Sequence, residues 1–420
     1  MRILHLTYQY WPPEFGGELL NCMERHKSLV ERGHAVIVFT SGVPNYPRYE
    51  ICDGIQIFRS PLLSSNSSWQ PVLFNVWIVW KLLKCKCEVA QIGDLGEIEH
   101  VSRNSILNKA TSIFNGILSV LRNTIVKIMH WKEIRTYMVI SLADTPDEPL
   151  LLSGLSAGMR KQFLQAVDHV VAVSPAIKAA LIKKVPRANS VLIPYGIQDE
   201  LFLPYNLMGR DVTRTELHLN PKDVVFSFIG MVSYRKGFDL LAQVFSELSV
   251  GHPDWKLLVI GPNKSEQCAG LTDEEVQQVT EPVRGNTHAL FIGRVNDRSK
   301  IAAYLAASDV FVFPSRREGM GIAPLEAMSV EIPVIIARLP GITDQANIDG
   351  ETGFYIPSDD LYALKAAMLK LGSDKNLRKH MGQKGRETIV SRFGWSHFID
   401  QWEMIYQGVK PGVIGNVSDE

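Results

Sequence analysis

A pair of basic residues in the second half of the chain is placed where it could bind phosphate. Arg235 and Lys236 come shortly after the apolar run Val224–Ile229, and Gly237 follows them directly. Arginine offers a bidentate fork and lysine a compact charge, and both stabilise the negative charge that grows on a departing diphosphate. A solvated surface loop is the alternative interpretation of the same two residues.

Two glutamates follow a second apolar run, at 309–313, across a glycine-containing turn. Carboxylates accept hydrogen bonds from the vicinal hydroxyls of a sugar or ribose, so Glu318 on the loop and Glu326 in the first turn of a helix could hold two parts of one elongated ligand. Pro324 suits the first position of that helix, because it has no N–H to leave unpaired. The alternative is an exposed loop acid and an ordinary acid favoured by the helix dipole.

The elements that must position these residues alternate along the chain. Short β-branched runs are separated by helical stretches, which is typical of parallel sheets covered by helices on both faces. The runs form two series, so the fold class is α/β, with two doubly wound Rossmann-like domains. The first series is 2–6, 35–40, 55–58, 88–92, 137–142 and 169–173, and the second is 224–229, 256–260, 289–292, 309–313, 332–336 and 354–356.

The length of 420 residues also favours two domains over a single core. Proline and glycine gather at the end of the first series, and a linker is predicted at 201–210. We therefore expect an N-terminal domain at 1–205, a C-terminal domain at 206–392, and a C-terminal helix and tail at 393–420.

The composition limits the classes of binding partner and the cellular compartment that we expect. The net charge is zero, which gives no global field for nucleic acid. The five cysteines are scattered, which suits reduced thiols, and Cys85 and Cys87 have no second Cys/His pair nearby to complete a zinc site. The N-terminal strand runs into a proline-rich loop without the pattern of a secretory signal, so we expect a cytoplasmic protein.

One helical pattern lies outside the two strand series, at 105–135. Its polar side carries Lys109, Arg122 and Lys127. A surface helix docked on its own sheet is one interpretation, and a helix lying on an anionic membrane surface is the other. The apolar run 71–80 before it is too short to cross a bilayer and is favoured as core over an interfacial contact.

Placed in order, the motifs resemble those of the family-4 retaining glycosyltransferases (glycosyl transferases group 1), which have the GT-B fold. The pieces that carry the resemblance are FIGMVSYRKGFDLL, KLLVIGP, FIGRVNDRSKIAAYLAASDVFVFPSRREGMGIAPLEAMSVEIPVI and GITDQANIDGETGFYIPSDD in the second half, and YQYWPPEFGGELLNCMERHKSLVERGHAVIVFTS in the first. The resemblance implies two domains facing across a cleft, an N-terminal acceptor-binding domain, a C-terminal nucleotide-sugar-binding domain, and a C-terminal helix that returns toward the first domain.

The resemblance also assigns roles to matching positions. It implies that Arg235 and Lys236 bind the donor diphosphate, Glu318 the transferred sugar and Glu326 the ribose, with Glu318, Arg235 and Lys236 as the catalytic group. The remaining donor-site residues are Gly16, Gly17, Gly319, Gly321, and the backbone of Arg294 and Val295. The donor is a nucleotide diphosphate sugar, with UDP slightly favoured over GDP, and the acceptor is a sugar or a lipid-linked, growing surface polysaccharide.

By resemblance the reaction retains the anomeric configuration. Family members use same-face attack, in which the leaving phosphate oxygen takes the acceptor proton; a covalent intermediate on a carboxylate is the other route to retention. No carboxylate in the first half stands out as a nucleophile, and no Asp-x-Asp motif follows a strand, so we expect no catalytic metal and no cofactor beyond the co-substrate.

Two positions depart from the family pattern. Where members often read T-L-H-D, this chain reads Ser141, Leu142, Ala143, Asp144, so the usual sugar-contacting histidine is missing and Asp144 is the candidate substitute. Glu331 stands where the family usually has glycine, and we expect it on the surface. Because of Ala143, a catalytically silent sugar-nucleotide-binding subunit stays open as an alternative, as does a nucleotide-sugar epimerase of the same fold.

Overall fold

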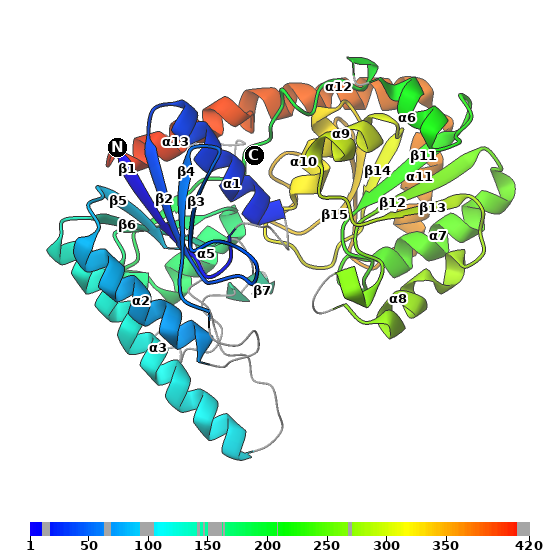
Figure 1. Ribbon diagram of the computed structural model, residues 1–420. Coiled ribbons are helices and arrows are strands. Elements are labelled where there is room, and N and C mark those ends of the chain that lie inside the picture. Colours follow the sequence, from blue (N-terminus) through cyan, green and yellow to red (C-terminus); the bar gives the residue numbers. More distant parts are fainter. Residues whose placement is uncertain are drawn as a thin grey trace. The chain divides into compact units, whose positions relative to one another are not determined.

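The computed structural model describes residues 1–10, 17–62, 69–92, 105–140, 143–145, 148–149, 162, 164–207, 209–267 and 271–409. The chain forms two compact units, one of Met1–Pro194 with Ile399–Glu420, and the other of Tyr195–Phe398. Figure 1 labels most of the elements of each unit. None of the helices in these described stretches combines the length and the apolar character that a bilayer crossing requires.

The first unit is built on an eight-stranded sheet in the order β10-β9-β6-β5-β1-β2-β4-β3. All neighbours pair in parallel except β3, which is antiparallel to β4 at one edge. The strands are β1 (Arg2–Leu6), β2 (Ala35–Thr40), β3 (Tyr49–Cys52), β4 (Ile55–Arg59), β5 (Val89–Ile92), β6 (Arg135–Ile140), β9 (His169–Ala172) and β10 (Ser190–Leu192); β7 (Ala143–Thr145) and β8 (Glu148–Pro149) form a separate pair.

Helices cover this sheet on both faces. The chain steps one way from β1 through β2 to β4 and then reverses to β5 and β6. Because such crossovers are right-handed, the reversal places α2 and α3 on the face opposite α1. The helices are α1 (Gly17–Glu31), α2 (Gln70–Lys84), α3 (Ser105–Trp131) and α5 (Pro175–Lys184).

The C-terminal helix α13 (Trp395–Tyr406) packs its second half against the first unit. Glu403 accepts from His34 Nε2 at 2.7 Å, and both Glu403 and Asp400 pair with Arg32 at 2.6 Å. Tyr137 of β6 donates to the Ile405 carbonyl at 2.5 Å. The expected return of the last helix to the N-terminal domain is therefore confirmed.

The second unit is a parallel six-stranded sheet in the order β13-β12-β11-β14-β15-β16. Its aromatic core includes Phe226, Phe238, Phe245 and Trp255, all at most 2% exposed. The strands are β11 (Val224–Ile229), β12 (Trp255–Ile260), β13 (Ala289–Gly293), β14 (Val310–Phe313), β15 (Val334–Ala337) and β16 (Gly353–Ile356). The helices are α6 (Arg210–Glu216), α7 (Phe238–Gly251), α8 (Asp273–Thr280), α9 (Arg298–Ala306), α10 (Ile322–Ser329), α11 (Leu361–Ser373) and α12 (Lys375–Arg392), with short 3₁₀ turns at Tyr205–Leu207, Ser265–Gln267 and Glu281–Val283.

The two doubly wound Rossmann-like sheets predicted from the sequence are confirmed. The passage into the second unit comes at Tyr195, earlier than the predicted linker at 201–210. Gly196 lies against the Phe398 ring, Ile197 N–H donates to the Phe393 carbonyl at 2.8 Å, and Phe202 is fully buried. Residues 196–202, which reach only the start of the predicted linker, are thus packed within the second unit.

The prediction that Arg122 lies on the exposed basic side of the 105–135 helix is wrong. Arg122 is 1% exposed, and Lys132, just beyond α3, donates to the carbonyls of Leu82 at 2.8 Å and Cys85 at 2.5 Å at the end of α2. Lys127 is exposed, and the side chain of Lys109 lies outside the described residues. A cation that caps a neighbouring helix is not available to a surface.

Candidate functional site

Three of the charged residues singled out in the sequence meet where the order of the second sheet reverses. Arg235 and Lys236 lie in the loop after β11, and Glu318 lies in the loop after β14. β11 and β14 are neighbours, although β12 and β13 come between them in the sequence. Open α/β sheets bind ligands outside the carboxyl ends of their strands at such a switch point.

A glycine allows the two loops to touch. Gly237 has φ +69°, and a Cβ there would come within 2.0 Å of the Pro314 carbonyl oxygen. The loops are also joined by a hydrogen bond from Arg316 N–H to the Arg235 carbonyl at 3.0 Å. Any side chain at 237 would push the loops apart, so this glycine sets the distance between the cations and the carboxylate.

The side chains form one buried cluster. Lys236 Nζ lies 2.5 Å from Glu318 Oε1, and Arg235 Nη1 lies 3.7 Å from the same oxygen. Ser315 Oγ donates to it at 2.6 Å. The Lys236 and Glu318 side chains are 14% and 8% exposed. Burial lowers the pKa of Lys236, and Glu318 opposes that shift.

The cluster holds two cations against one carboxylate, and the Arg235 side chain is still about a third exposed. An anion that reached this strand edge would meet both cations and the first turn of α7, which begins after Gly237 with no side-chain cap. Free N–H groups at a helix start favour anions. The arrangement is therefore suited to a phosphate or diphosphate group.

A neighbouring arginine fixes the loop rather than joining the cluster. Arg316 pairs with Asp239 at 2.7 Å and with Asp359 at 2.6 Å, and its guanidinium lies 3.7 Å from the centre of the Tyr234 ring. With its charge already paired twice, Arg316 holds the backbone that carries Arg235 and Glu318.

Glu326 is placed apart from this cluster. It is 4% exposed, and its Oε1 accepts from Arg298 Nη2 at 2.8 Å. Arg298 also donates to Gln198 Oε1 at 3.0 Å. Helix α10 begins at Ile322, so Glu326 is its fifth residue and not in the first turn, and Pro324 is the third residue and not the first. Because the first four N–H groups of a helix have no intrahelical partner, proline still fits there.

The residues expected to hold the base follow β13, two strands from β11. Gly293 ends the strand with φ +80°. The Arg294 side chain bonds to the Gln267 carbonyl at 2.9 Å and to Asn296 at 3.0 Å, and Val295 packs against buried residues of the same sheet. The Arg294 side chain is therefore held within the loop and Val295 packs on the core, and the expected contact of their backbone with a base stays a prediction.

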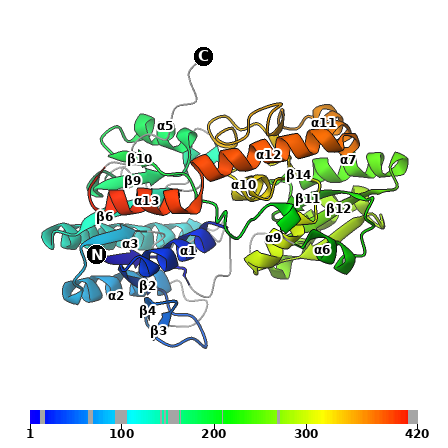
Figure 2. The ribbon, with the colours of Figure 1, turned by 90° about the horizontal axis from the view of Figure 1, so that it is seen from above.

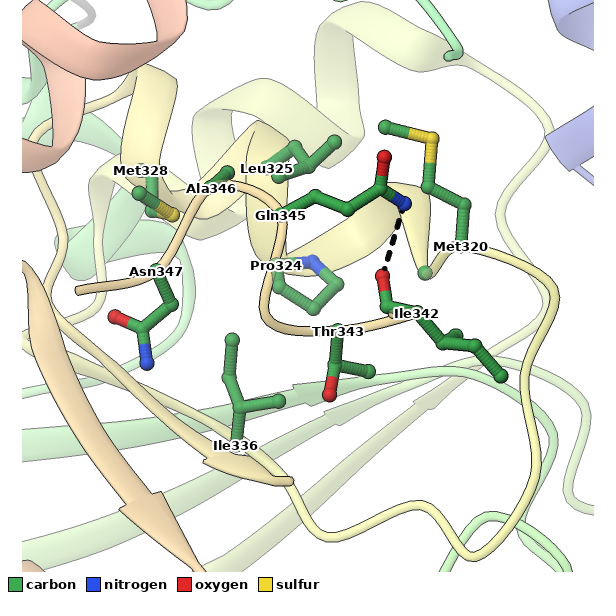
Figure 3. A pocket seen from close by; sticks show the side chains of 11 residues that line it. Met320, Pro324, Leu325, Met328, Ile336, Ile342, Thr343, Gln345, Ala346 and Asn347 are labelled. Atoms are coloured by element: carbon green, nitrogen blue, oxygen red, sulfur yellow. Dashed lines mark hydrogen bonds between the residues drawn. The ribbon is translucent and has the colours of Figure 1, made fainter. Parts of the chain in front are cut away.

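Figure 3 shows a pocket behind the glycine turn. Gly321, with φ +79°, is one of its lining residues, and the Gln345 amide donates to the Ile342 carbonyl at 3.1 Å. Its lining residues are Met320, Gly321, Pro324, Leu325, Met328, Ile336, Ile342, Thr343, Gln345, Ala346 and Asn347. Most of them are apolar, so the pocket supports the α10 turn and offers little to a charged ligand. Gly319 is buried in the same turn.

The predicted residues of the first half are only partly described. Gly16 lies outside the described residues, and Gly17 is the first residue of α1. Asp144 and Ala143 lie in β7, whose side chains are not described. These residues belong to the first unit, and the donor-site residues discussed above belong to the second.

One group of side chains in the described part of the chain has metal-ligand spacing. His5 Nδ1 and His26 Nε2 lie 3.7 and 3.8 Å from Cys22 Sγ. Burial lowers the pKa of both histidines, so both rings are neutral. However, Arg25 Nη2 lies 3.4 Å from the same sulfur. A guanidinium in this position opposes a metal dication, so we assign no metal-dependent step to this group.

Three residues of the site did not stand out in the sequence. Ser315 and Arg298 bind the two glutamates, and Arg316 braces the loop. Ser315 and Arg316 belong to the SRRE stretch that ends in Glu318. The signal available in the sequence was the polarity of this stretch between a buried strand and a glycine turn. Arg298 lies 28 positions before its partner Glu326, so spacing gave no indication of that pair.

Comparison with known proteins shows similarity to glycosyltransferases. Residues 209–388 match the family described as Glycosyl transferases group 1. A capsular polysaccharide biosynthesis glycosyltransferase, CapM, from Staphylococcus aureus is 27% identical over 254 residues, which cover 59% of this chain and 63% of that protein. An N-acetyl-alpha-D-glucosaminyl L-malate synthase from Bacillus anthracis is 24% identical over 94% of this chain and 95% of its own. Among solved structures, Anabaena HepE in complex with UDP-glucose has a TM-score of 0.71 at 15% identity, covering 97% of this chain and all of that one.

Proposed function

Because the chain belongs to the glycosyl transferases group 1 family and has the GT-B fold, we propose that it is a retaining, family-4 hexosyltransferase that uses a nucleotide diphosphate sugar. The observation that carries the proposal is the cluster of Arg235, Lys236 and Glu318 at the switch point of the second sheet. Two cations suit the donor diphosphate, and the buried carboxylate suits the hydroxyls of the sugar attached to it.

The proposed step is a same-face displacement. The acceptor oxygen bonds to the anomeric carbon as the bond from that carbon to the diphosphate oxygen breaks, and the hydroxyl proton passes to the leaving phosphate oxygen. Negative charge grows on the diphosphate during this step. Arg235 and Lys236 would then stabilise the transition state more than the ground state, which is what accelerates a reaction.

Glu326 would hold the ribose, and the backbone at Arg294 and Val295 the base. Glu326 is already oriented by Arg298 at 2.8 Å, which fixes its free oxygen lone pairs in one direction. We propose that Gly16 and Gly17 let the first loop approach the donor phosphates closely and that Asp144 contacts the sugar. UDP is favoured as the nucleotide, a proposal supported by the UDP-glucose complex of the similar Anabaena protein.

For the acceptor we propose a lipid-linked, growing surface polysaccharide at the inner face of the membrane. The similarity to a capsular polysaccharide glycosyltransferase supports this class. We also propose that transfer needs no metal ion, because the two cations of the cluster can take the role of a metal at the diphosphate. EDTA should then leave the rate unchanged.

The test is donor turnover by purified protein. UDP release from UDP-glucose should fall by roughly 10²–10³-fold in Lys236→Ala, which is the usual cost of removing one group that stabilises transition-state charge. Glu318→Ala should also lose turnover. Lys222→Ala is the matched control, because Lys222 is an exposed lysine just before the opposite end of β11, and it should keep wild-type activity.

Two outcomes would reject the proposal in favour of the alternatives. Tight UDP-glucose binding with no turnover of any donor would indicate a sugar-nucleotide-binding subunit. An epimerised sugar, seen by NMR when UDP-GlcNAc is incubated without an acceptor, would indicate an epimerase. A product with inverted anomeric configuration would be compatible with a transferase but would exclude the same-face displacement.

A further inference from the structure

The outward side of the α2–α3 helix pair is apolar and basic, and the proposed chemistry does not use it. We propose that this two-helix face, formed by Val76, Trp80 and Leu83 of α2 and Ile117, Val120 and Trp131 of α3, docks on an anionic lipid bilayer. The two helices lie side by side on one face of the first sheet (Figure 2). Their outward sides therefore point away from the sheet together.

Helix α2 is apolar on both of its sides. Phe74, Ile78 and Leu82 are buried toward the sheet, while Val76, Trp80 and Leu83 are 48%, 51% and 54% exposed. The exposed residues recur at intervals of four and three, so they form one stripe along the helix. A helix that is apolar all round is normally covered on all sides. The exposed stripe thus indicates a surface that meets something apolar.

Helix α3 extends the same surface. Ile117, Val120 and Trp131 are 38%, 66% and 77% exposed. They fall on the side of α3 away from its buried residues Leu118, Ile125 and Met129. Together the two helices expose more large apolar side chains than isolated surface residues would explain.

The charges on the two helices select the occupant. Neither the α2 nor the α3 sequence contains an aspartate or glutamate, and both contain lysine. Lys84 is exposed with its Nζ 4.5 Å from the centre of the Trp80 ring, and Lys127 is exposed on α3. Glu88 and Glu133, which follow the helices, are the acids at that end. Tryptophan at the headgroup level with lysine reaching lipid phosphate is the usual arrangement of an interfacial helix.

A second copy of the chain fits this face less well than lipid does. A symmetric dimer would place Lys84 and Lys127 against the same surface of the other copy, where the helices carry no acid and only Glu88 and Glu133, beyond the helix ends, could pair with them. An anionic bilayer satisfies the lysines and covers the apolar stripe. The inference deepens the proposed function, because a lipid-linked acceptor would be held at the same bilayer.

The binding test uses vesicle flotation without donor or acceptor, so its result is independent of transfer activity. Wild-type protein should float with phosphatidylglycerol–phosphatidylcholine vesicles and bind pure phosphatidylcholine more weakly. Each lysine near an anionic surface contributes about fivefold to the partition coefficient, so Lys84→Gln with Lys127→Gln should weaken binding roughly 25-fold. Trp80→Glu and Val120→Glu should weaken it at least about tenfold, because each places a charge in the apolar stripe.

The matched control is Val250→Glu, which changes an 87% exposed valine at the end of α7 in the second unit. It should bind vesicles as the wild type does, and all variants should keep UDP release from UDP-glucose. Failure of the wild type to float, or equal loss in Val250→Glu, would overturn the inference. So would a dimer seen by sedimentation velocity without lipid that Trp80→Glu dissociates, since a second copy would then cover the face.

Discussion

The contact between Lys236 and Glu318 allows its structural and its catalytic contributions to be separated in one experiment. The perturbation is a double-mutant cycle of Lys236→Met and Glu318→Gln. Both changes remove charge while keeping a side chain of similar length. The cycle measures the free energy of unfolding and the affinity for a nucleotide diphosphate sugar in each of the four proteins.

The stability change follows from the burial of the pair. At 2.5 Å and side-chain exposures of 14% and 8%, the two charges attract strongly but have lost most of their hydration. Removing one partner leaves the other charge buried, which costs about 3–5 kcal/mol in well-buried pairs. Ser315 and Arg235 stay close to Glu318, so we expect a loss at or just below the lower end of this range, about 2–3 kcal/mol for each single variant.

The double variant should recover much of that loss, because neither charge is then left alone. We expect a coupling free energy of about 2–3 kcal/mol, at the upper end for residues in contact. Donor affinity should behave differently. Lys236 is proposed to bind the diphosphate directly, so affinity should stay low in every variant that lacks it, including the stable double variant.

Urea denaturation gives the stabilities, and isothermal titration calorimetry with UDP-glucose gives the affinities. If the losses in unfolding free energy of the two single variants simply added in the double variant, Lys236 and Glu318 would not be each other's main partners. Wild-type donor affinity in the double variant would refute the assignment of Lys236 to the diphosphate, even if the stability cycle came out as expected.

Two further predictions concern stability. Glu331 follows α10 with φ +66°, a conformation that costs a residue with a side chain about 1–2 kcal/mol. Glu331→Gly should therefore raise the melting temperature by about 2–8 °C. Glu331→Ala keeps the strained φ and should not raise it, so equal effects of the two changes would contradict the conformational reason. Burial, with Arg25, lowers the pKa of His5 from 6.5 to about 3, so the unfolded chain binds more protons between these values and stability falls as the pH drops below 6.5. The loss should reach about 2 kcal/mol at pH 5 in urea titrations, and an unchanged pH slope in His5→Gln would contradict it.

Much of the fold could be predicted because the sequences of buried parallel strands are short, continuous apolar runs. Runs such as Val224–Ile229 coincide with β11 as observed. The strands that were missed are short and lie at or near the sheet edge, such as Tyr49–Cys52 and Ser190–Leu192. Edge strands bury less apolar surface than central strands, so the apolar pattern in their sequences is weaker.

The contacts of the site were less accessible to sequence reasoning. Lys236 and Glu318 are 82 positions apart, and they meet only because β14 pairs with β11 after two intervening strands. Apolar runs give the number of strands but not their order in the sheet. The family resemblance assigned both residues to one donor site, and the partners Ser315 and Arg298 came only from the structure.

The Glu331 position shows what a departure from a family pattern can mean physically. Its side chain was expected on the surface, and it is in fact half-buried, with a pKa raised by burial. The backbone matters more: Glu331 N–H donates to the Met328 carbonyl at 3.1 Å and Ile332 N–H to Ala327 at 3.0 Å, which closes α10. Such a helix end favours glycine, so the substitution affects the stability of the helix that carries Glu326.

The helix pair of the first unit shows why a pattern of charges on a helix needs its neighbours before it can be interpreted. Arg122 and Lys127 are five positions apart and look alike in sequence, but Arg122 is buried and Lys127 is exposed. Lys132 is likewise held by the end of α2. Once these two cations are removed from the surface, electrostatic attraction alone is too small to hold the chain on lipid, because each remaining lysine contributes only about 1 kcal/mol. Membrane binding through this face must therefore depend on Trp80 and its apolar neighbours, and salt should weaken it without abolishing it.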